Sequence, residues 1–185
     1  MLFAHDIEHS LACVVDLVNT GSSTSGQDRL GDLEDLLSFV RRHEVSEVGA
    51  LTRTDLVAVR ALRNRIRPVF AALDDAAAAG LVNALVAESP VTPRLTDHDG
   101  YPWHVHYFAP GASLAEHLAV DCGMALAHLI SVGEHERLRT CAALDCDQVL
   151  VDLSRNRSKR YCDARTCGNR VHVAAYRERR RHAPS

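Results

Sequence analysis

The sequence predicts a mainly α protein of the α+β class: a helical N-terminal domain with one small β-hairpin, then a small four-cysteine module that ends in a helix. Three observations lead to this prediction. Apolar residues recur at helical spacing through most of residues 1–135. The spacing becomes alternating over one short stretch of that region. Four of the six cysteines then fall in two close pairs within residues 136–185.

The first half of the chain carries the patterns of several helices. The apolar run Leu11–Asn19 is compatible with a strand or a helix, whereas residues 32–43 place leucines on one helical face. The stretch Thr54–Asp75 begins with a candidate N-cap and continues as a long apolar stripe. We expect Pro68 to kink or split this helix, because proline lacks an N–H and its ring crowds the preceding turn. Residues 76–88 continue with helix-forming composition.

A β-hairpin is expected over Val91–Phe108. Prolines flank its first half, a His-Asp-Gly turn stands at residues 98–100, and apolar residues alternate from Trp103 onward. Residues 112–132 then return to helical spacing and form the last helix of the N-terminal domain.

Charge is divided unevenly along the chain. Residues 137–185 hold 12 Arg and Lys against 5 Asp and Glu, a formal charge of +7, whereas residues 1–136 hold 9 against 19, a charge of −10. An acidic body with a basic tail predicts that the tail meets a polyanion. We place the domain boundary at this change, between residues 1–135 and 136–185. No apolar run is long enough to span a bilayer, so we expect a cytoplasmic protein without membrane association.

The four paired cysteines have the spacing C-x4-C, fifteen residues, C-x4-C. Two such pairs can converge as four thiolates around one tetrahedral Zn²⁺, and the alternative is two disulfides. Zinc is favoured, because the polar N-terminal segment is no secretory signal and 185 residues suffice for a core without crosslinks. Four thiolates close the coordination sphere, which predicts one structural zinc ion per chain. The predicted ligands are Cys141, Cys146, Cys162 and Cys167.

Basic residues lie between and after the cysteine pairs. In an extended segment, positions 155, 157 and 159 share one face; on a helix, positions 170, 177 and 181 do so. Arginine suits both phosphate and guanine, so we expect this surface to bind DNA, the alternative being an ordinary solvated surface. The candidate DNA-binding residues are Arg155, Asn156, Arg157, Lys159, Arg160, Arg170, Arg177, Arg180 and Arg181.

A ligand pocket is the candidate role for the predicted hairpin. His104 and His106 point to the same side of a strand, beside the only tryptophan, Trp103. Two histidines without an identifiable third ligand are weak evidence for a metal, so a small-molecule site is the stronger reading, and a half-buried hairpin is the alternative. Asp16 and Asn19 stand within an apolar run and need partners if buried. They either face this pocket or pin the N-terminal segment.

The cysteine-rich module resembles a known family in several short motifs. Those motifs are Cys141-Ala142, Cys146, Asp152-Leu153-Ser154-Arg155-Asn156, Arg160-Tyr161-Cys162 and Cys167-Gly168-Asn169-Arg170, which are similar to the CGNR zinc finger. Residues 1–135, with Asp16-Leu17-Val18-Asn19-Thr20, resemble the helical ABATE domain that precedes this finger in bacterial stress-response transcription regulators. The sequence departs from the finger's pattern at Leu150, where an aromatic residue is usual, at Tyr161, where tryptophan is usual, and at Asp163-Ala164, where Ser-Met is usual.

The resemblance implies DNA binding by the finger and a sensory or ligand-binding role for the N-terminal domain. We therefore expect a transcriptional regulator, with DNA as partner and a small molecule as effector. A homodimer is expected, because one finger makes few base contacts. The rival interpretations are a protein-interaction adaptor and a thiol–zinc redox switch. No nucleophile–base pair, phosphate loop or nucleotide fingerprint is present, so we expect no enzyme activity.

Overall fold

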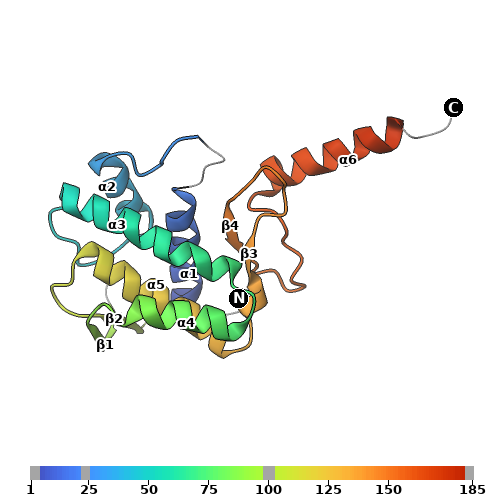
Figure 1. The fold of residues 1–185 in the computed structure, drawn as a ribbon. Coiled ribbons are helices and arrows are strands. Elements are labelled where there is room, and N and C mark those ends of the chain that lie inside the picture. The colour runs from blue at the N-terminus through green and yellow to red at the C-terminus, as the bar shows by residue number, and fades with distance from the viewer. Residues whose placement is uncertain (1–4, 22–25, 98–102, 182–185) are drawn as a thin grey trace.

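The computed structural model describes residues 5–21, 26–97 and 103–181, and within them it confirms the mainly helical α+β class. Helices dominate, and two separate antiparallel strand pairs complete the fold (Figure 1). We call the residues up to 135 the body and the residues from 136 onward the module. Among the described residues, no helix has both the length and the apolar character to cross a membrane.

The part of the body that the structure describes contains five α-helices. They are α1 (His5–Asn19), α2 (Leu33–Arg42), α3 (Arg53–Ile66), α4 (Asp75–Val86) and α5 (Leu114–Ser131). The apolar run Leu11–Asn19, which was compatible with a strand or a helix, is therefore helical. Thr52, rather than Thr54, caps α3: its side chain accepts from the Asp55 N–H while the Asp55 carboxylate accepts from Thr52. Such reciprocal capping satisfies N–H groups that have no partner within the helix.

Pro68 splits the predicted long helix, as expected. The α-helix α3 ends at Ile66, and the chain continues as the 3-10 helix η2 (Arg67–Ala71) with proline in its first turn. Proline is tolerated there because the first N–H groups of a helix have no internal partner. Asp74 then caps α4 through the Ala77 N–H, so the chain restarts in a new direction.

The predicted hairpin is present as β1 (Val91–Thr96) and β2 (His104–Phe108). The strands are antiparallel, with Leu95 opposite Val105 and a bulge between Val91 and Arg94. The predicted turn at residues 98–100 lies outside the described residues. Strand β2 packs against α5, which brings the histidines of the strand to the body's central helix.

Helix α5 is the centre of the body and contacts α1, α3, α4 and β2. Its buried residues include Leu118, Leu126 and Leu129. The approach of α4 to α5 depends on Gly123, because a Cβ built there would lie 2.5 Å from the Val86 side chain. A side chain at position 123 would therefore force the two helices apart.

The module begins with a second hairpin, β3 (Leu138–Thr140) and β4 (Val149–Val151), preceded by the short helix η4 (His135–Arg137). Side chains alternate along β4, as in any strand. Val149 and Val151 belong to the main core of the body, whereas Leu150 belongs to a second core with Cys141 and Cys167. The predicted boundary at residues 135/136 thus precedes a hairpin that both cores share.

Asn19, at the end of α1, binds β4 through both atoms of its amide. Its Nδ2 donates to the Val149 carbonyl at 2.9 Å, and its Oδ1 accepts from the Val149 N–H at 2.7 Å. The residue is buried, so these bonds satisfy backbone groups that water does not reach. Arg67 adds a second link, donating to the carbonyls of Asp147 and Val18. Asn19 therefore pins the N-terminal helix to the module.

Replacing Asn19 by alanine is expected to loosen this junction. The variant leaves the N–H and carbonyl of Val149 buried without partners, which costs about 2–4 kcal/mol in the free energy of unfolding. Denaturant unfolding measures this loss, and hydrogen exchange should speed up at the Val149 amide. The control is Asn83→Ala on the exposed face of α4, which should change stability by less than about 0.5 kcal/mol. Equal effects of the two variants would contradict this role.

Candidate functional site

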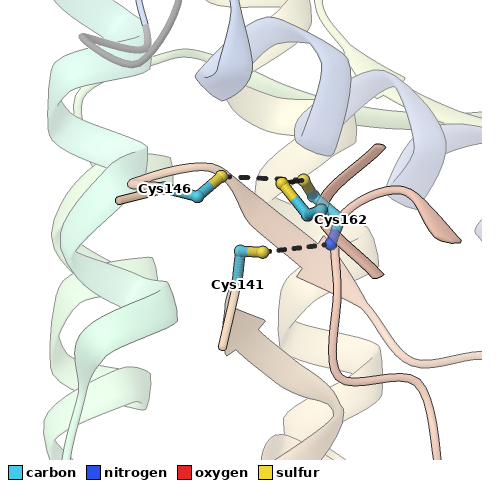
Figure 2. A group of neighbouring side chains, drawn as sticks. Cys141, Cys146 and Cys162 are labelled. Carbon is cyan, nitrogen blue, oxygen red and sulfur yellow. Dashed lines mark hydrogen bonds between the residues drawn. The ribbon is translucent and has the colours of Figure 1, made fainter. Parts of the chain in front are cut away.

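The four predicted zinc ligands converge from three parts of the module. Cys141 follows β3, Cys146 lies in the turn before β4, and Cys162 follows a loop (Figure 2). Cys167 lies in the helical turn η5 (Ala164–Gly168), directly before α6 (Asn169–Arg181). The four sulfur atoms all lie within 4.8 Å of one another.

The sulfur separations fit zinc. Cys162 Sγ lies 3.7 Å from Cys146 Sγ and 3.6 Å from Cys167 Sγ. A tetrahedral ion with Zn–S bonds of about 2.3 Å requires sulfurs about 3.8 Å apart, whereas a disulfide requires about 2.05 Å. The disulfide alternative is therefore excluded in this structure, where all six cysteines are free. The four thiols are placed to hold one zinc ion in a closed, structural site.

Local turns hold the cysteines in place. The Cys146 N–H donates to the Ala143 carbonyl at 3.1 Å, and the Cys162 N–H donates to Cys141 Sγ at 3.4 Å. Asp163 caps η5 by accepting from the Thr166 N–H at 2.7 Å. Both pairs therefore present their sulfurs from tight turns, which explains how a C-x4-C spacing places two ligands on one ion.

Without a metal, three of the four thiols differ in their tendency to ionise. Burial opposes ionisation of Cys141, but N–H groups of Ala143 and Cys162 outweigh it and lower the pKa of this thiol. Burial, with the neighbouring thiols, raises the pKa of Cys162 and Cys167. Four adjacent thiolates therefore need a cation to offset their mutual repulsion, and zinc supplies two positive charges at the point where they meet.

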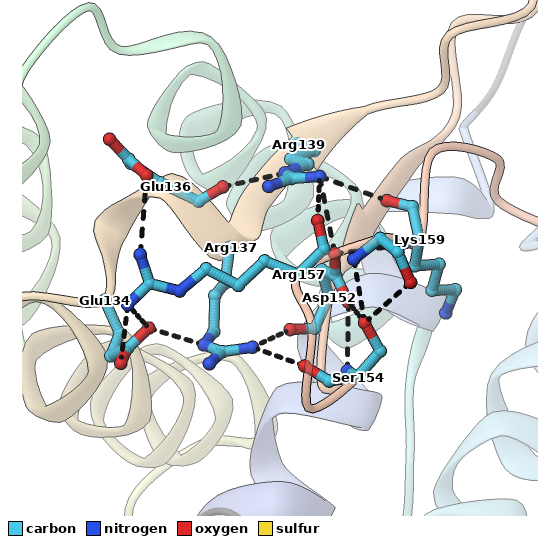
Figure 3. Close-up of polar contacts among 9 residues, drawn as sticks. Glu134, Glu136, Arg137, Arg139, Asp152, Ser154, Arg157 and Lys159 are labelled. Carbon is cyan, nitrogen blue, oxygen red and sulfur yellow. Dashed lines mark hydrogen bonds and ion pairs between the residues drawn. The ribbon is translucent and has the colours of Figure 1, made fainter.

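A buried aspartate organises the loop between the cysteine pairs (Figure 3). Asp152 is fully buried, and its Oδ1 accepts from the N–H and hydroxyl of Ser154 at 2.9 and 2.5 Å. Its Oδ2 accepts from the Lys159 N–H at 2.9 Å and pairs with Arg139 at 3.3 Å. Residues 154–159 therefore form a turn around Asp152, with Arg157 at a positive φ of 49°. Because the segment is a turn and not extended, positions 155, 157 and 159 do not share one face as they would in a strand.

A buried arginine supports the same loop. Arg137 is 3% exposed, and its guanidinium donates to the carbonyls of Asp152 and Ser154 and to Glu134. These bonds satisfy a charge that would otherwise be costly to bury. The carboxylate of Glu134 also accepts from Arg157 at 3.0 Å (Figure 3). Acidic residues of the body thus meet basic residues of the module at the junction.

The predicted DNA-binding residues fall into two groups. Arg157, Arg170 and Arg181 form ion pairs with Glu134, Asp145 and Glu178 respectively. The other side chains are exposed without an acidic partner among the described residues; they are Arg155, Asn156, Lys159, Arg160, Arg177 and Arg180. Arg170 also donates to Cys167 Sγ at 3.5 Å, so this residue belongs partly to the metal centre.

Helix α6 has no buried residue and extends away from the body (Figure 1). Both of its large apolar side chains beyond the first turn, Val173 and Tyr176, are about half exposed, at 46% and 54%. Isolated helices of this length are marginal in water. The basic face of α6 is therefore an accessible surface, anchored at one end by the metal centre.

Comparison with known families agrees with this architecture. The model of the ABATE family, described as a putative stress-induced transcription regulator, matches residues 11–144, which is well over half of the chain. The chain belongs to the ABATE family. The CGNR zinc finger model matches residues 137–180, the module. The two matches confirm both resemblances and identify a zinc-finger protein of a regulator family. No curated protein matches the chain.

The ABATE domain contains a cavity of about 290 Å³ beside the first hairpin. Trp103, His104 and His106 line it, as predicted for a ligand pocket. Its other walls come from α1, α5 and the loop after α2. Among the lining residues are His9, His43, His117 and Asp121, so the walls are unusually rich in histidine.

Asp16 and Asn19 do not line this cavity, contrary to the expectation. Asn19 faces β4, as described above. Asp16 binds Arg42 at 2.8 Å and His43 at 2.9 Å. The hydrogen bond with His43, helped by Arg42, outweighs burial and lowers the pKa of Asp16 to about 2. Both polar residues of the run therefore pin α1 to its neighbours, which was the alternative considered for them.

Sequence reasoning missed several polar residues of the cavity, among them His9, His43, His117 and Asp121. Two of these, His117 and Asp121, belong to the same helix. They lie four positions apart on α5, so both face the same side of the helix, toward His106. Their spacing is visible in the sequence, but it is also typical of a solvated helix face. Only the packing of β2 against α5 shows that His117 and Asp121 meet the histidines of β2.

Replacing Cys162 by serine is expected to remove one equivalent of zinc per chain. Structural zinc contributes about 10–16 kcal/mol of apparent binding energy to small fingers, so residues beyond β4 should lose their order. The body should also lose thermal stability, because Leu138, Val149 and Val151 belong to its core. Metal analysis and thermal unfolding measure the two effects. The control Cys122→Ala, in the buried core of the body, should retain the zinc. Unchanged zinc content in the Cys162 variant would refute the ligand assignment.

Proposed function

We propose that this ABATE-family protein is a DNA-binding transcription regulator whose CGNR finger makes the DNA contacts. The observation that carries the proposal is helix α6, which is basic, has no buried residue and is fixed at one end by the zinc ligand Cys167. A helix with no buried side chain has no packing reason, within this chain, to hold its conformation. It gains one when a partner covers it.

The arrangement of α6 suits the major groove of DNA. Arg170, Arg177 and Arg181 lie along one face, because separations of 7 and 11 residues are close to whole turns. The helix spans 13 residues, about 20 Å, and a groove about 12 Å wide admits it. Arginine forms paired hydrogen bonds with guanine. We therefore assign base contacts to this face, with Arg177 the first candidate because no ion pair engages it among the residues that the structure describes.

Phosphate contacts are assigned to the turn around Asp152. Arg155, Lys159 and Arg160 are exposed on this turn and carry positive charge without an acidic partner among the described side chains. Arg157 is engaged by Glu134 and Glu136, so we give it a smaller part in binding. The buried bonds of Asp152 fix the turn before DNA arrives, which lowers the entropic cost of forming the contacts.

For the ABATE domain we propose a sensing role. The cavity of about 290 Å³ is at the small end of the range for small-molecule sites, and polar side chains converge on it. A ligand there would change DNA affinity only by its differential affinity for two conformations of the protein. We further propose that the protein acts in the cytoplasm as a homodimer, since one finger supplies few base contacts.

Binding to DNA is expected to depend steeply on salt. If Arg155, Lys159, Arg160 and Arg180 each neutralise one phosphate, log K should fall with log salt at a slope of about −3.6. The double variant Arg155→Ala/Arg160→Ala should bind all sequences more weakly and show a slope reduced by about 1.8. Fluorescence anisotropy with a random-sequence duplex measures both quantities.

The matched control removes the same charge from the body. Arg41 and Arg53 are exposed on α2 and α3, so Arg41→Ala/Arg53→Ala alters net charge equally without touching the finger. This variant should keep the wild-type slope of log K against log salt. For the proposed base contact, selection from a random DNA library should reveal whether Arg177→Ala changes the preferred sequence. Equal effects of the two double variants would refute the proposed surface. Binding of an acidic protein but of no DNA would favour the adaptor interpretation instead.

A further inference from the structure

Two imidazoles and one carboxylate meet at a wall of the ABATE cavity. Asp121 Oδ2 lies 3.1 Å from His106 Nδ1 and 3.2 Å from His117 Nε2. The three ligand atoms are all within 4.8 Å of one another. They come from β2 and α5, two elements that pack directly together.

We propose that His106, His117 and Asp121 bind a divalent first-row transition-metal ion. Metal–nitrogen and metal–oxygen bonds of about 2.0–2.2 Å place neighbouring ligand atoms about 2.9 Å apart at right angles and about 3.4 Å apart at the tetrahedral angle. The separations of 3.1 and 3.2 Å fall between these limits. Imidazole and carboxylate ligands suit zinc, iron, cobalt and nickel, and three protein ligands leave further positions open. The site therefore differs in kind from the closed four-thiolate centre.

Neighbouring groups already hold the three ligands in place. The second oxygen of Asp121 accepts from the Tyr107 N–H at 3.1 Å, which orients its carboxylate. The ring of His117 stacks on Phe108 with centroids 3.5 Å apart, and the ring of His106 contacts Phe108 edge-on. Such support fixes the orientation of ligands before a metal binds and is typical of metal sites.

The site is screened from bulk water but accessible from the cavity. The side chains of His106, His117 and Asp121 are only 13%, 6% and 18% exposed, and all three line the cavity of about 290 Å³. That volume leaves space for a water or a small anion on an open coordination position. His104 Nε2 lies 3.2 Å from His106 Nε2 and is next to the site. The inference deepens the proposed sensing role by naming the class of ligand, yet it does not depend on DNA binding.

Cobalt titration of the full-length protein, with zinc in its finger, tests the proposal. We expect one Co²⁺ per chain beyond the finger's zinc, with visible bands but no thiolate-to-cobalt charge transfer in the near ultraviolet. Trp103, the only tryptophan, lines the same cavity, so bound cobalt should quench its fluorescence. Asp121→Asn should weaken cobalt binding at least about a hundredfold, because it replaces a charged ligand in a site of three. The control His128→Gln, elsewhere on α5, should bind as the wild type does.

A measurement on the wild-type protein keeps the proposal testable even if the Asp121 variant does not fold. Paramagnetic cobalt should broaden the amide signals of residues 104–108 and 114–122 and leave those of α6 unaffected. The proposal is overturned if no cobalt binds beyond the finger, if the broadening is centred elsewhere, or if a folded Asp121→Asn binds cobalt as tightly as His128→Gln. A bound metal that leaves DNA affinity unchanged would support the site and reject its coupling to the finger, so the two failures remain distinguishable.

Discussion

The alternation of side chains along β4 ties the zinc centre to the helical body. Val149 and Val151 fill the body's core while Leu150, between them, packs beside the zinc ligands. A slip of one residue in this strand would exchange the two faces, because side chains of a strand alternate with a period of two. Asn19 specifies the register by binding both backbone groups of Val149. The finger is therefore a continuation of the ABATE fold and is positioned by it.

The charge asymmetry of the chain has a structural use. Some basic residues of the finger hold it against the acidic body: Arg137 and Arg157 both reach Glu134. Others, such as Arg155 and Lys159, project from a turn that buried Asp152 organises. A count of positive charges treats these residues alike. The structure separates those that stabilise the junction from those that are available to a polyanion.

The parts predicted well from sequence were those specified by local spacing. The cysteine pairs, the hairpin at Val91–Phe108 and the break at Pro68 each follow from rules that act within a few residues. The parts missed depend on contacts between distant segments. Asn19 is 130 positions from its partner Val149. Likewise, nothing in the spacing of His117 and Asp121 indicates that β2 lies over them. Burial of Asp152 between Val151 and Leu153 also required the fold, because its partners Arg139 and Lys159 lie thirteen and seven positions away along the chain.

Helix α6 has a consequence for the thermodynamics of recognition. Because its 13 residues bury no side chain, its helical state is maintained chiefly by the metal-anchored first turn and by intrinsic propensity. If DNA binds α6 as proposed, any frayed part of the helix must form on binding, and the conformational entropy lost in doing so subtracts from affinity. Helix propensity at exposed positions in the middle of the helix, such as Ala174 and Ala175, then affects affinity without any contact to the DNA. Substitutions there would change occupancy of a target while the contacts themselves stay unchanged.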